Sequence, residues 1–253
     1  MRRNIIRPGA IAAMAALVLA LLSIGSSHAD NFTPGGDSFY VSDETGFPFN
    51  SPTLLGTVSK FKASNGSFQG VLITAAVGGT ATSGYPGGFC FTPNGVVVNP
   101  GSQPQLVVAN QNICDGNGEI KAFDEATGAF KSTLVASTDP NAPSAPFGIL
   151  LYQGKLLVAD EGPGGPPPGQ IDVFDATTPP ATFSGHLDTT GYANAKFFHP
   201  FGMVLGPDGD LYVATRSFTV GVPGDVIRFD LTTGKFDRVF VSGSGCSCNL
   251  DRK

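Results

Sequence analysis

The stretch Gly224-Asp225-Val226-Ile227-Arg228-Phe229-Asp230 decides the fold, because the chain repeats its pattern three more times. A glycine opens each copy, a β-branched residue follows two positions later, and a phenylalanine follows five positions later. This alternation of apolar and polar residues is typical of a half-buried β-strand. The other copies are residues 56–62, 118–124 and 169–175. Such self-similarity predicts an architecture built from repeated modules.

Other short apolar strands surround each copy. One strand precedes each copy, at residues 39–43, 106–110, 156–160 and 211–215. Strands that open with Pro-Phe-Gly begin at Pro146 and Pro200, and residues 238–241 form a strand after the last copy. Three of the copies run into a turn in which Gly is followed by one residue and then Phe, which is a hairpin signal. We therefore expect four antiparallel strands in each module.

Four antiparallel strands in a unit of about 50 residues make one blade of a β-propeller. The sequence thus predicts an all-β fold, a β-propeller of four-stranded blades within residues 30–253, in a ring that is closed or incomplete. The phenylalanine of each copy is expected to pack between neighbouring blades. The four recognisable blades lie at about residues 35–77, 87–136, 144–187 and 198–243.

Composition narrows the class of protein. Hydrophobic residues make up 41% of 253 residues, with 20 Phe, 34 Gly and 20 Pro, which is typical of a turn-rich globular β protein. Asp and Glu outnumber Lys and Arg by 20 to 15. An acidic chain with scattered basic residues is poorly suited to nucleic acid or to an anionic membrane surface.

The first 29 residues are typical of a secretory signal peptide, with arginines at the start, an apolar run over residues 10–22 and small residues before Asp30. No later segment is long and apolar enough to span a membrane. We therefore expect a secreted or periplasmic protein. Export permits disulfides, and four cysteines allow three pairings. Cys90 and Cys114 are both expected near one face of blade 2, which favours a disulfide bond between them. The alternative is that Cys90 is a small buried apolar residue. The pairing of Cys246 and Cys248 stays open.

Residues 200–214 and 226–230 resemble NHL-type β-propeller repeats, in particular those of exported bacterial propellers that carry PEP-CTERM anchors. The resemblance covers roughly residues 35–245 and implies a fold far more than a function. The resemblance implies six blades, whereas four are recognisable here. The printed sequence shows no such anchor, and it lacks the Trp of WD repeats. We therefore expect a truncated product, or else a divergent ring of four or five blades. An open ring would expose strand edges and favour self-association.

In a β-propeller, the ends of the second strands and the starts of the first strands of the blades meet at one face, around a central channel. The candidate ligand-binding residues are expected there. Carboxylate and amide oxygens that ring a cavity can bind calcium, although Asp and Asn at strand ends also cap loops. His199 is a candidate general base or a histidine stacked on a neighbouring phenylalanine. Arg216 would hold an anionic ligand or pair with a carboxylate of the neighbouring blade. The predicted set is Asp43, Asn110, Asp160, Glu161, His199 and Arg216.

Three functions fit these residues. The first is a non-catalytic exported propeller that binds protein or glycan through its loop face, with no catalytic residue and no required cofactor. The second is a metal-dependent lactone hydrolase similar to the gluconolactonase family, and this resemblance implies metal ligation by Asn110 and Asp160. The chain departs from that family in one motif: Glu161-Gly162-Pro163 follows the second strand of a blade, whereas the family's Glu-Gly-Pro motif belongs at a first strand. The third is a lyase similar to streptogramin-cleaving propellers, with His199 at the channel.

Overall fold

The computed structural model describes residues 38–43, 56–81, 89–99, 103–112, 116–163, 167–219 and 221–243. The predicted signal peptide, Cys114, Cys246 and Cys248 lie outside the described residues. The described residues form an all-β structure, which confirms the predicted fold class. The short exceptions are one helical turn, α2 (Ala75–Gly78), and one 3-10 turn, η2 (Ala195–Phe197). No helix in the described ranges is both long and apolar enough to traverse a membrane.

Four consecutive antiparallel sheets make up the blades, and within each the strands pair in chain order. Blade 1 contains β1 (Ser38–Asp43), β2 (Thr57–Lys62) and β3 (Phe68–Ile73). Blade 2 contains β6 (Pro93–Asn99), β7 (Gln105–Asn110), β8 (Glu119–Asp124) and β9 (Phe130–Val135). Blade 3 contains β10 (Pro146–Tyr152), β11 (Lys155–Asp160), β12 (Gln170–Asp175) and β13 (Thr182–His186). Blade 4 contains β14 (His199–Leu205), β15 (Leu211–Arg216), β16 (Asp225–Asp230) and β17 (Lys235–Ser242).

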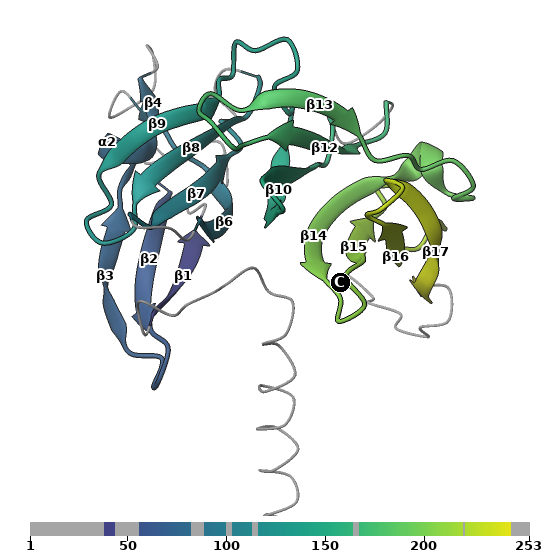
Figure 1. The fold of residues 1–253 in the computed structure, drawn as a ribbon, viewed down its shortest axis with the longest axis horizontal. Coiled ribbons are helices and arrows are strands. Elements are labelled where there is room, and N and C mark those ends of the chain that lie inside the picture. The colour runs from purple at the N-terminus through teal and green to yellow at the C-terminus, as the bar shows by residue number, and fades with distance from the viewer. Residues whose placement is uncertain are drawn as a thin grey trace, which may run out of the picture.

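The blades follow one another along an arc, with β6, β10 and β14 nearest its centre (Figure 1). The inner strands of successive blades contact one another, β1 with β6, β6 with β10 and β10 with β14. Between blades 1 and 2 lies a two-stranded ribbon of β4 (Thr80–Ala81) and β5 (Phe89–Cys90). Blades 1 and 4 form the two ends of the arc. The first sheet has three strands in the described residues, and its β1 corresponds to the second strand of the other blades.

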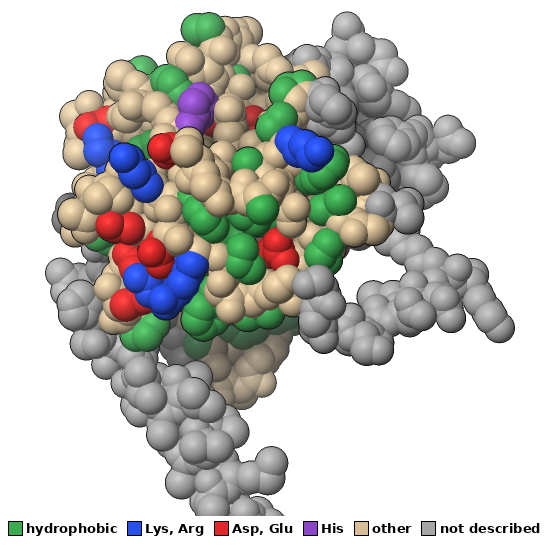
Figure 2. All heavy atoms as spheres, turned by 90° about the vertical axis from the view of Figure 1, so that its right-hand side faces the viewer, with side chains coloured by type: hydrophobic (Ala, Val, Ile, Leu, Met, Phe, Trp, Pro, Cys, Tyr) green, Lys and Arg blue, Asp and Glu red, His purple; other side chains and the backbone are tan. Residues whose placement is uncertain are grey.

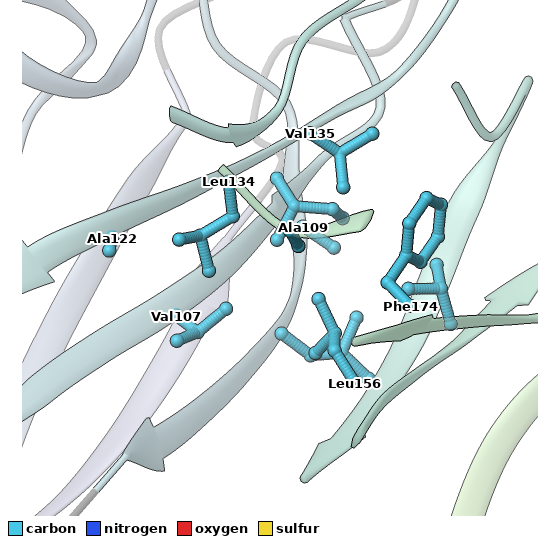
Figure 3. Close-up of a cluster of buried hydrophobic side chains, with 11 residues drawn as sticks. Val107, Ala109, Ala122, Leu134, Val135, Leu156 and Phe174 are labelled. Carbon is cyan, nitrogen blue, oxygen red and sulfur yellow. The ribbon is translucent and has the colours of Figure 1, made fainter. Parts of the chain in front are cut away.

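Hydrophobic side chains hold each blade against the next, as the sequence predicted for the repeated phenylalanine. Phe123, Phe174 and Phe229 are almost completely buried, and each belongs to a different cluster between two blades. Between blades 2 and 3, Phe174 and Leu156 face Val107 of blade 2 (Figure 3). Burying a Phe or Leu side chain contributes roughly 1.5–3 kcal/mol. The interfaces between blades are therefore the core of the molecule.

The glycine that opens each repeat lies where two backbone segments nearly touch. A Cβ atom on Gly118 would collide with the ring of Pro146, at the start of the next blade. A Cβ atom on Gly169 would collide with the carbonyl oxygen of Asp160, on the neighbouring strand. Only glycine permits such an approach without moving the chain. The repeated glycine is thus a packing requirement of the blade.

One local expectation is wrong. His186 follows Ser184-Gly185, which predicts an exposed loop; the residue is exposed, but it ends strand β13, the outermost strand of blade 3. A bulge between Val173 and Phe174 shifts the register of this hairpin, so that His186 pairs with Asp172. The Ser-Gly sequence before His186 suggested a turn, whereas Gly185 lies inside the strand at a φ of +130°. This backbone angle explains the glycine without a turn.

Candidate functional site

Asp160 caps a loop, the alternative that the sequence left open for it. It ends β11 with little solvent exposure, and its carboxylate accepts hydrogen bonds from three backbone amides. The distances are 2.9 Å from Ser144, 2.8 Å from Ala145 and 3.0 Å from Gly162. The Oγ of Ser144 donates a further hydrogen bond at 3.0 Å. These donors bind both carboxylate oxygens and hold the entry to blade 3 against the exit of β11.

Asn110 has the same role in blade 2. Its Oδ1 accepts a hydrogen bond from the backbone amide of Thr92 at 2.8 Å, and its Nδ2 donates to Glu119 Oε1 at 2.7 Å. Asp43 ends β1 in an exposed position, and its part in ligand binding stays a prediction. Within the described ranges, no three Asp, Glu, His or Cys side chains converge as metal ligands would.

Glu161 and Arg216 form an ion pair across blades 3 and 4, as predicted for Arg216 and a neighbouring carboxylate. The guanidinium Nε donates to Glu161 Oε1, and a terminal guanidinium nitrogen donates to Oε2. The Glu161 side chain is buried, whereas the Arg216 side chain is half exposed. A two-point contact of this kind fixes both the position and the plane of the guanidinium. The ion pair thus holds the planar, positively charged guanidinium group at the junction of two blades.

Three phenylalanine rings surround that guanidinium. The Arg216 Cζ lies 5.3 Å from the ring centroid of Phe147, 4.9 Å from that of Phe201 and 4.7 Å from that of Phe218. All three distances are within the range of a cation–π interaction. The rings of Phe147 and Phe201 also pack on each other at 4.5 Å. Phe201 is 42% exposed and Phe218 is 49% exposed, whereas Phe147 is buried.

His199 contacts one of these rings. Its Nδ1 lies 2.7 Å from the carbonyl oxygen of Glu161, and because a carbonyl only accepts, Nδ1 carries the proton. Its ring meets Phe218 edge to face at 4.9 Å. The predicted stacking is therefore present, but the partner is Phe218 and not one of the adjacent phenylalanines. Burial lowers the pKa of His199, which favours the neutral ring. We call Phe147, Glu161, His199, Phe201, Arg216 and Phe218 the channel cluster.

The strand register explains how these residues meet. Pro146 pairs with Asp160 at the start of β10, and His199 pairs with Arg216 at the start of β14. In both blades a bulge follows the proline, at the Phe-Gly step. A bulge redirects side chains and is common next to functional sites. The equivalent position in blade 2 holds Asn94, whose amide contacts the carbonyl oxygen of Pro146 at 3.3 Å.

The aromatic part of the site was not predicted from the sequence. The repeated Pro-Phe-Gly indicated a strand, but a phenylalanine between proline and glycine at the start of two inner strands is also a signal for a site. Phe218 had no signal, because it lies in a loop outside the repeat. The sequence correctly brought Glu161, His199 and Arg216 together. It also placed Asp43, Asn110 and Asp160 in the same set, but none of these three belongs to the channel cluster.

A second polar pair lies within blade 3, on the neighbouring strands β12 and β13. Asp172 is almost fully buried, and its Oδ1 lies 2.8 Å from Nδ1 of the half-exposed His186. The other carboxylate oxygen, Oδ2, has no hydrogen-bond partner among the described residues. Burial, followed by the charge of Asp160, raises the pKa of Asp172 to about 8. Burial also lowers the pKa of His186. Both shifts favour a neutral pair at neutral pH.

Comparison with known proteins supports the fold and no particular activity. No family model and no curated protein matches the chain. Among solved structures, an exo-β-1,3-galactanase from Phanerochaete chrysosporium is 13% identical at a TM-score of 0.50, and the match covers 81% of this chain and 46% of the galactanase chain. A candidate 6-phosphogluconolactonase from Bacteroides uniformis is 11% identical at a TM-score of 0.50, and the match covers 85% of this chain and 56% of that chain.

A β-propeller domain of Swd1 from Myceliophteria thermophila is 16% identical at a TM-score of 0.45, with 74% of this chain and 50% of that chain covered. The chain thus spans about half the length of these structural neighbours. At identities this low the likeness concerns the fold alone. Together with the four consecutive antiparallel sheets, it establishes an all-β propeller with four blades in the described residues.

Proposed function

We propose that this chain is an exported, non-catalytic β-propeller that binds glycans at the channel cluster. The observation that carries the proposal is the pair of exposed rings, Phe201 and Phe218, that both lie within cation–π distance of the Arg216 guanidinium. Exposed aromatic groups rimmed by polar residues mark binding surfaces in soluble proteins. A sugar ring offers one apolar C–H face and a rim of hydroxyl groups, which matches an aromatic surface bordered by charge.

The cluster is built to stay rigid. Phe147 packs on Phe201, and the ion pair with Glu161 fixes the guanidinium next to the rings. A rigid platform loses little conformational entropy when a ligand binds. Aromatic side chains also have few rotatable bonds. These features favour recognition of a sugar without rearrangement of the site.

The chemistry of the cluster supports binding over hydrolysis. Glycoside hydrolysis normally requires two carboxyl groups, one of them an acid. Glu161 is the only carboxylate in the channel cluster, and it is buried and ion-paired with Arg216. His199 is buried and already donates its Nδ1 proton to a backbone carbonyl. Neither side chain is placed as a proton donor toward solvent.

The setting is part of the proposal. A signal peptide at residues 1–29 would deliver the mature chain to the periplasm or the exterior, where polysaccharides are abundant ligands. The resemblance to NHL-type exported propellers agrees with that setting. The galactanase that shares the fold is described with β-1,3-galactotriose, which is a precedent for sugars on this architecture.

Binding is tested by titrating protein from the exported fraction with neutral and acidic oligosaccharides, β-1,3-galactotriose included, by calorimetry. We expect at least one sugar class to bind, and Phe201→Ala or Phe218→Ala to weaken it about tenfold or more, the effect of losing roughly 1.4 kcal/mol. The matched control is Phe130→Ala, which removes a similarly exposed phenylalanine from the outer strand β9 of blade 2. Equal losses in all three variants, or no binding by the wild type, would overturn the proposal.

A lactone hydrolase is the competing function, because a candidate lactonase shares the fold. To act as metal ligands, Asn110 and Asp160 would have to exchange their backbone hydrogen bonds for the metal. The test is hydrolysis of a sugar lactone with and without a chelator, alongside measurement of bound metal. Stoichiometric metal with chelator-sensitive turnover would replace the binding proposal with a catalytic one.

A further inference from the structure

The open face of blade 1 repeats a surface that the chain buries elsewhere. Phe39 and Val41 of β1, with Phe61 of β2, occupy the register positions of Leu106, Val108 and Phe123 in blade 2. The blade 2 residues are completely buried against blade 1. In blade 1, Phe39 and Val41 are both exposed, and Phe39 stacks on Phe61 at 5.2 Å. The blade therefore presents a preformed apolar face with no described blade against it.

The open face of blade 4 is the opposite half of the same interface. Val204, Tyr212 and Val226 occupy the register positions of Leu150, Leu157 and Ile171 in blade 3. The blade 3 residues pack against blade 4. Val204 is instead 60% exposed. Figure 2 shows the side of the molecule that carries blade 4, where hydrophobic side chains gather beside acidic and basic ones.

We propose that a second copy of this chain docks head to tail, with blade 4 of one copy against blade 1 of the other. The contact would repeat an interface that the chain itself forms three times, between blades 1 and 2, 2 and 3, and 3 and 4. Each copy supplies one half of that interface at each end, so a second copy is the partner that the existing packing specifies. Two copies contribute eight blades, which is within the range of closed propellers.

An open arc exposes more than the strand edges that the sequence predicts, because blades pack against one another through their faces. An open arc therefore exposes the faces of its two end blades. Association through faces buries side chains, whereas association through edges pairs backbones. The proposed contact accordingly depends on apolar side chains and not on strand addition.

A basic residue on the blade 4 face does not oppose this contact. Arg228 lies at the position of Ala122 in blade 2 and Val173 in blade 3. Its guanidinium is neutralised within blade 4 by the carboxylates of Asp208, Asp210 and Asp237, at distances of 2.9 to 3.1 Å. The same position in blade 1 holds Lys60, which pairs with Glu125 of blade 2 at 3.5 Å. A paired cation is thus already tolerated at such an interface.

The test measures molar mass by light scattering and sedimentation across a range of concentrations, on protein purified from the exported fraction. We expect the wild type to have at least twice the mass of the monomer, and Val41→Lys or Val204→Asp each to lower the association constant about tenfold or more. Val77→Lys is the matched control, because Val77 is 43% exposed and Val41 is 42% exposed. Circular dichroism verifies that each variant is folded.

Mixing the two variants separates this arrangement from others. In a head-to-tail contact, the Val204→Asp face of one copy meets the Val41→Lys face of the other, so the mixture forms a complex that neither variant forms alone. A symmetric contact through blade 1 would be lost with Val41→Lys, would ignore Val204→Asp and would not recover on mixing. That result, a monomeric wild type, or equal loss in the Val77→Lys control would overturn the proposal.

Discussion

The interior blade interfaces and the two end faces of the arc have the same sequence pattern but different environments. Phe123, Phe174 and Phe229 are buried between blades, whereas the equivalent Phe61 is only partly buried. The four residues share one signature and one register position. The difference arises from the neighbouring blade and not from the strand itself. The stability of a blade is therefore mainly a property of its interfaces, as in other repeat proteins.

The largest expected effect comes from truncating an interior phenylalanine. Phe174→Ala should lower the free energy of unfolding by about 3–5 kcal/mol, because it leaves a cavity between blades 2 and 3. Phe61→Ala should cost about 1 kcal/mol, since the side chain already contacts solvent. Urea denaturation at low protein concentration measures both. Equal losses would show that the end face is as well packed as the interior, which would contradict the comparison.

The sequence was sufficient to predict the repeats, the strand order and the burial of the repeated phenylalanines. These features depend on local periodicity and on a pattern that recurs, so four copies support one another. The bulge that places His186 on a strand was not predictable, because a single extra residue changes the register without changing composition. The exposure of Phe61 was also not predictable, since it depends on what lies beyond blade 1.

The predicted disulfide concerns the interface between blades 1 and 2. Cys90 is completely buried in the two-stranded ribbon there, while Cys114 lies outside the described residues, so the pairing stays a prediction. If the bond forms, Cys114→Ser should lower the free energy of unfolding by about 2–4 kcal/mol in oxidising buffer and have little effect in reducing buffer. Peptide mapping under non-reducing conditions identifies the partner. A Cys90 peptide that carries a free thiol would contradict the pairing.

Variants of the ion pair in the channel cluster test an interior contact between blades 3 and 4. Arg216→Leu should lower the free energy of unfolding by about 1–3 kcal/mol, because it leaves the buried Glu161 carboxylate without its partner; the exposure of Arg216 keeps the effect below that of a fully buried pair. The control Arg238→Leu removes an exposed pair with Asp237 and should change stability by less than about 0.5 kcal/mol.

The double variant Glu161→Gln with Arg216→Leu should recover part of that loss, because the glutamine carries no charge to bury. Urea denaturation of the two single variants and the double variant completes the cycle. Strict additivity of the two changes would show that the side chains do not interact in solution.

The channel cluster was only partly predictable for a physical reason. Charged residues at strand ends stand out in a sequence because they interrupt apolar runs, so Glu161, His199 and Arg216 were identified. Such residues look the same whether they bind a ligand or cap a loop, which explains why Asn110 and Asp160 were included. Phenylalanine is abundant in this chain, so an exposed ring such as Phe218 does not stand out from the core residues.

The smallest expected effect is a change in the pH dependence of stability. It separates a buried carboxylate from an exposed carboxylate on the same strand, β12. Because the pKa of Asp172 is raised to about 8, its favourable contribution is complete below the unfolded pKa of about 4 and is lost as the pH rises through about 8. The wild type should therefore lose stability as the pH rises to about 8 and level off above about pH 9. The window from about pH 7.5 to about pH 9 isolates this effect, because His186 and His199 are then almost entirely neutral in either state. Asp172→Asn should reduce this slope, since asparagine does not titrate.

Asp175→Asn is the matched control. Hydrogen bonds from Thr177 lower the pKa of Asp175 to about 2, so its contribution is present above about pH 4 and is lost only in acid. That variant should be slightly less stable than the wild type throughout the alkaline range and should keep the wild-type slope. Urea denaturation at several pH values measures both variants. If Asp172→Asn kept the full slope, Asp172 would already be ionised at neutral pH, and blade 3 would hold a buried carboxylate charge beside His186.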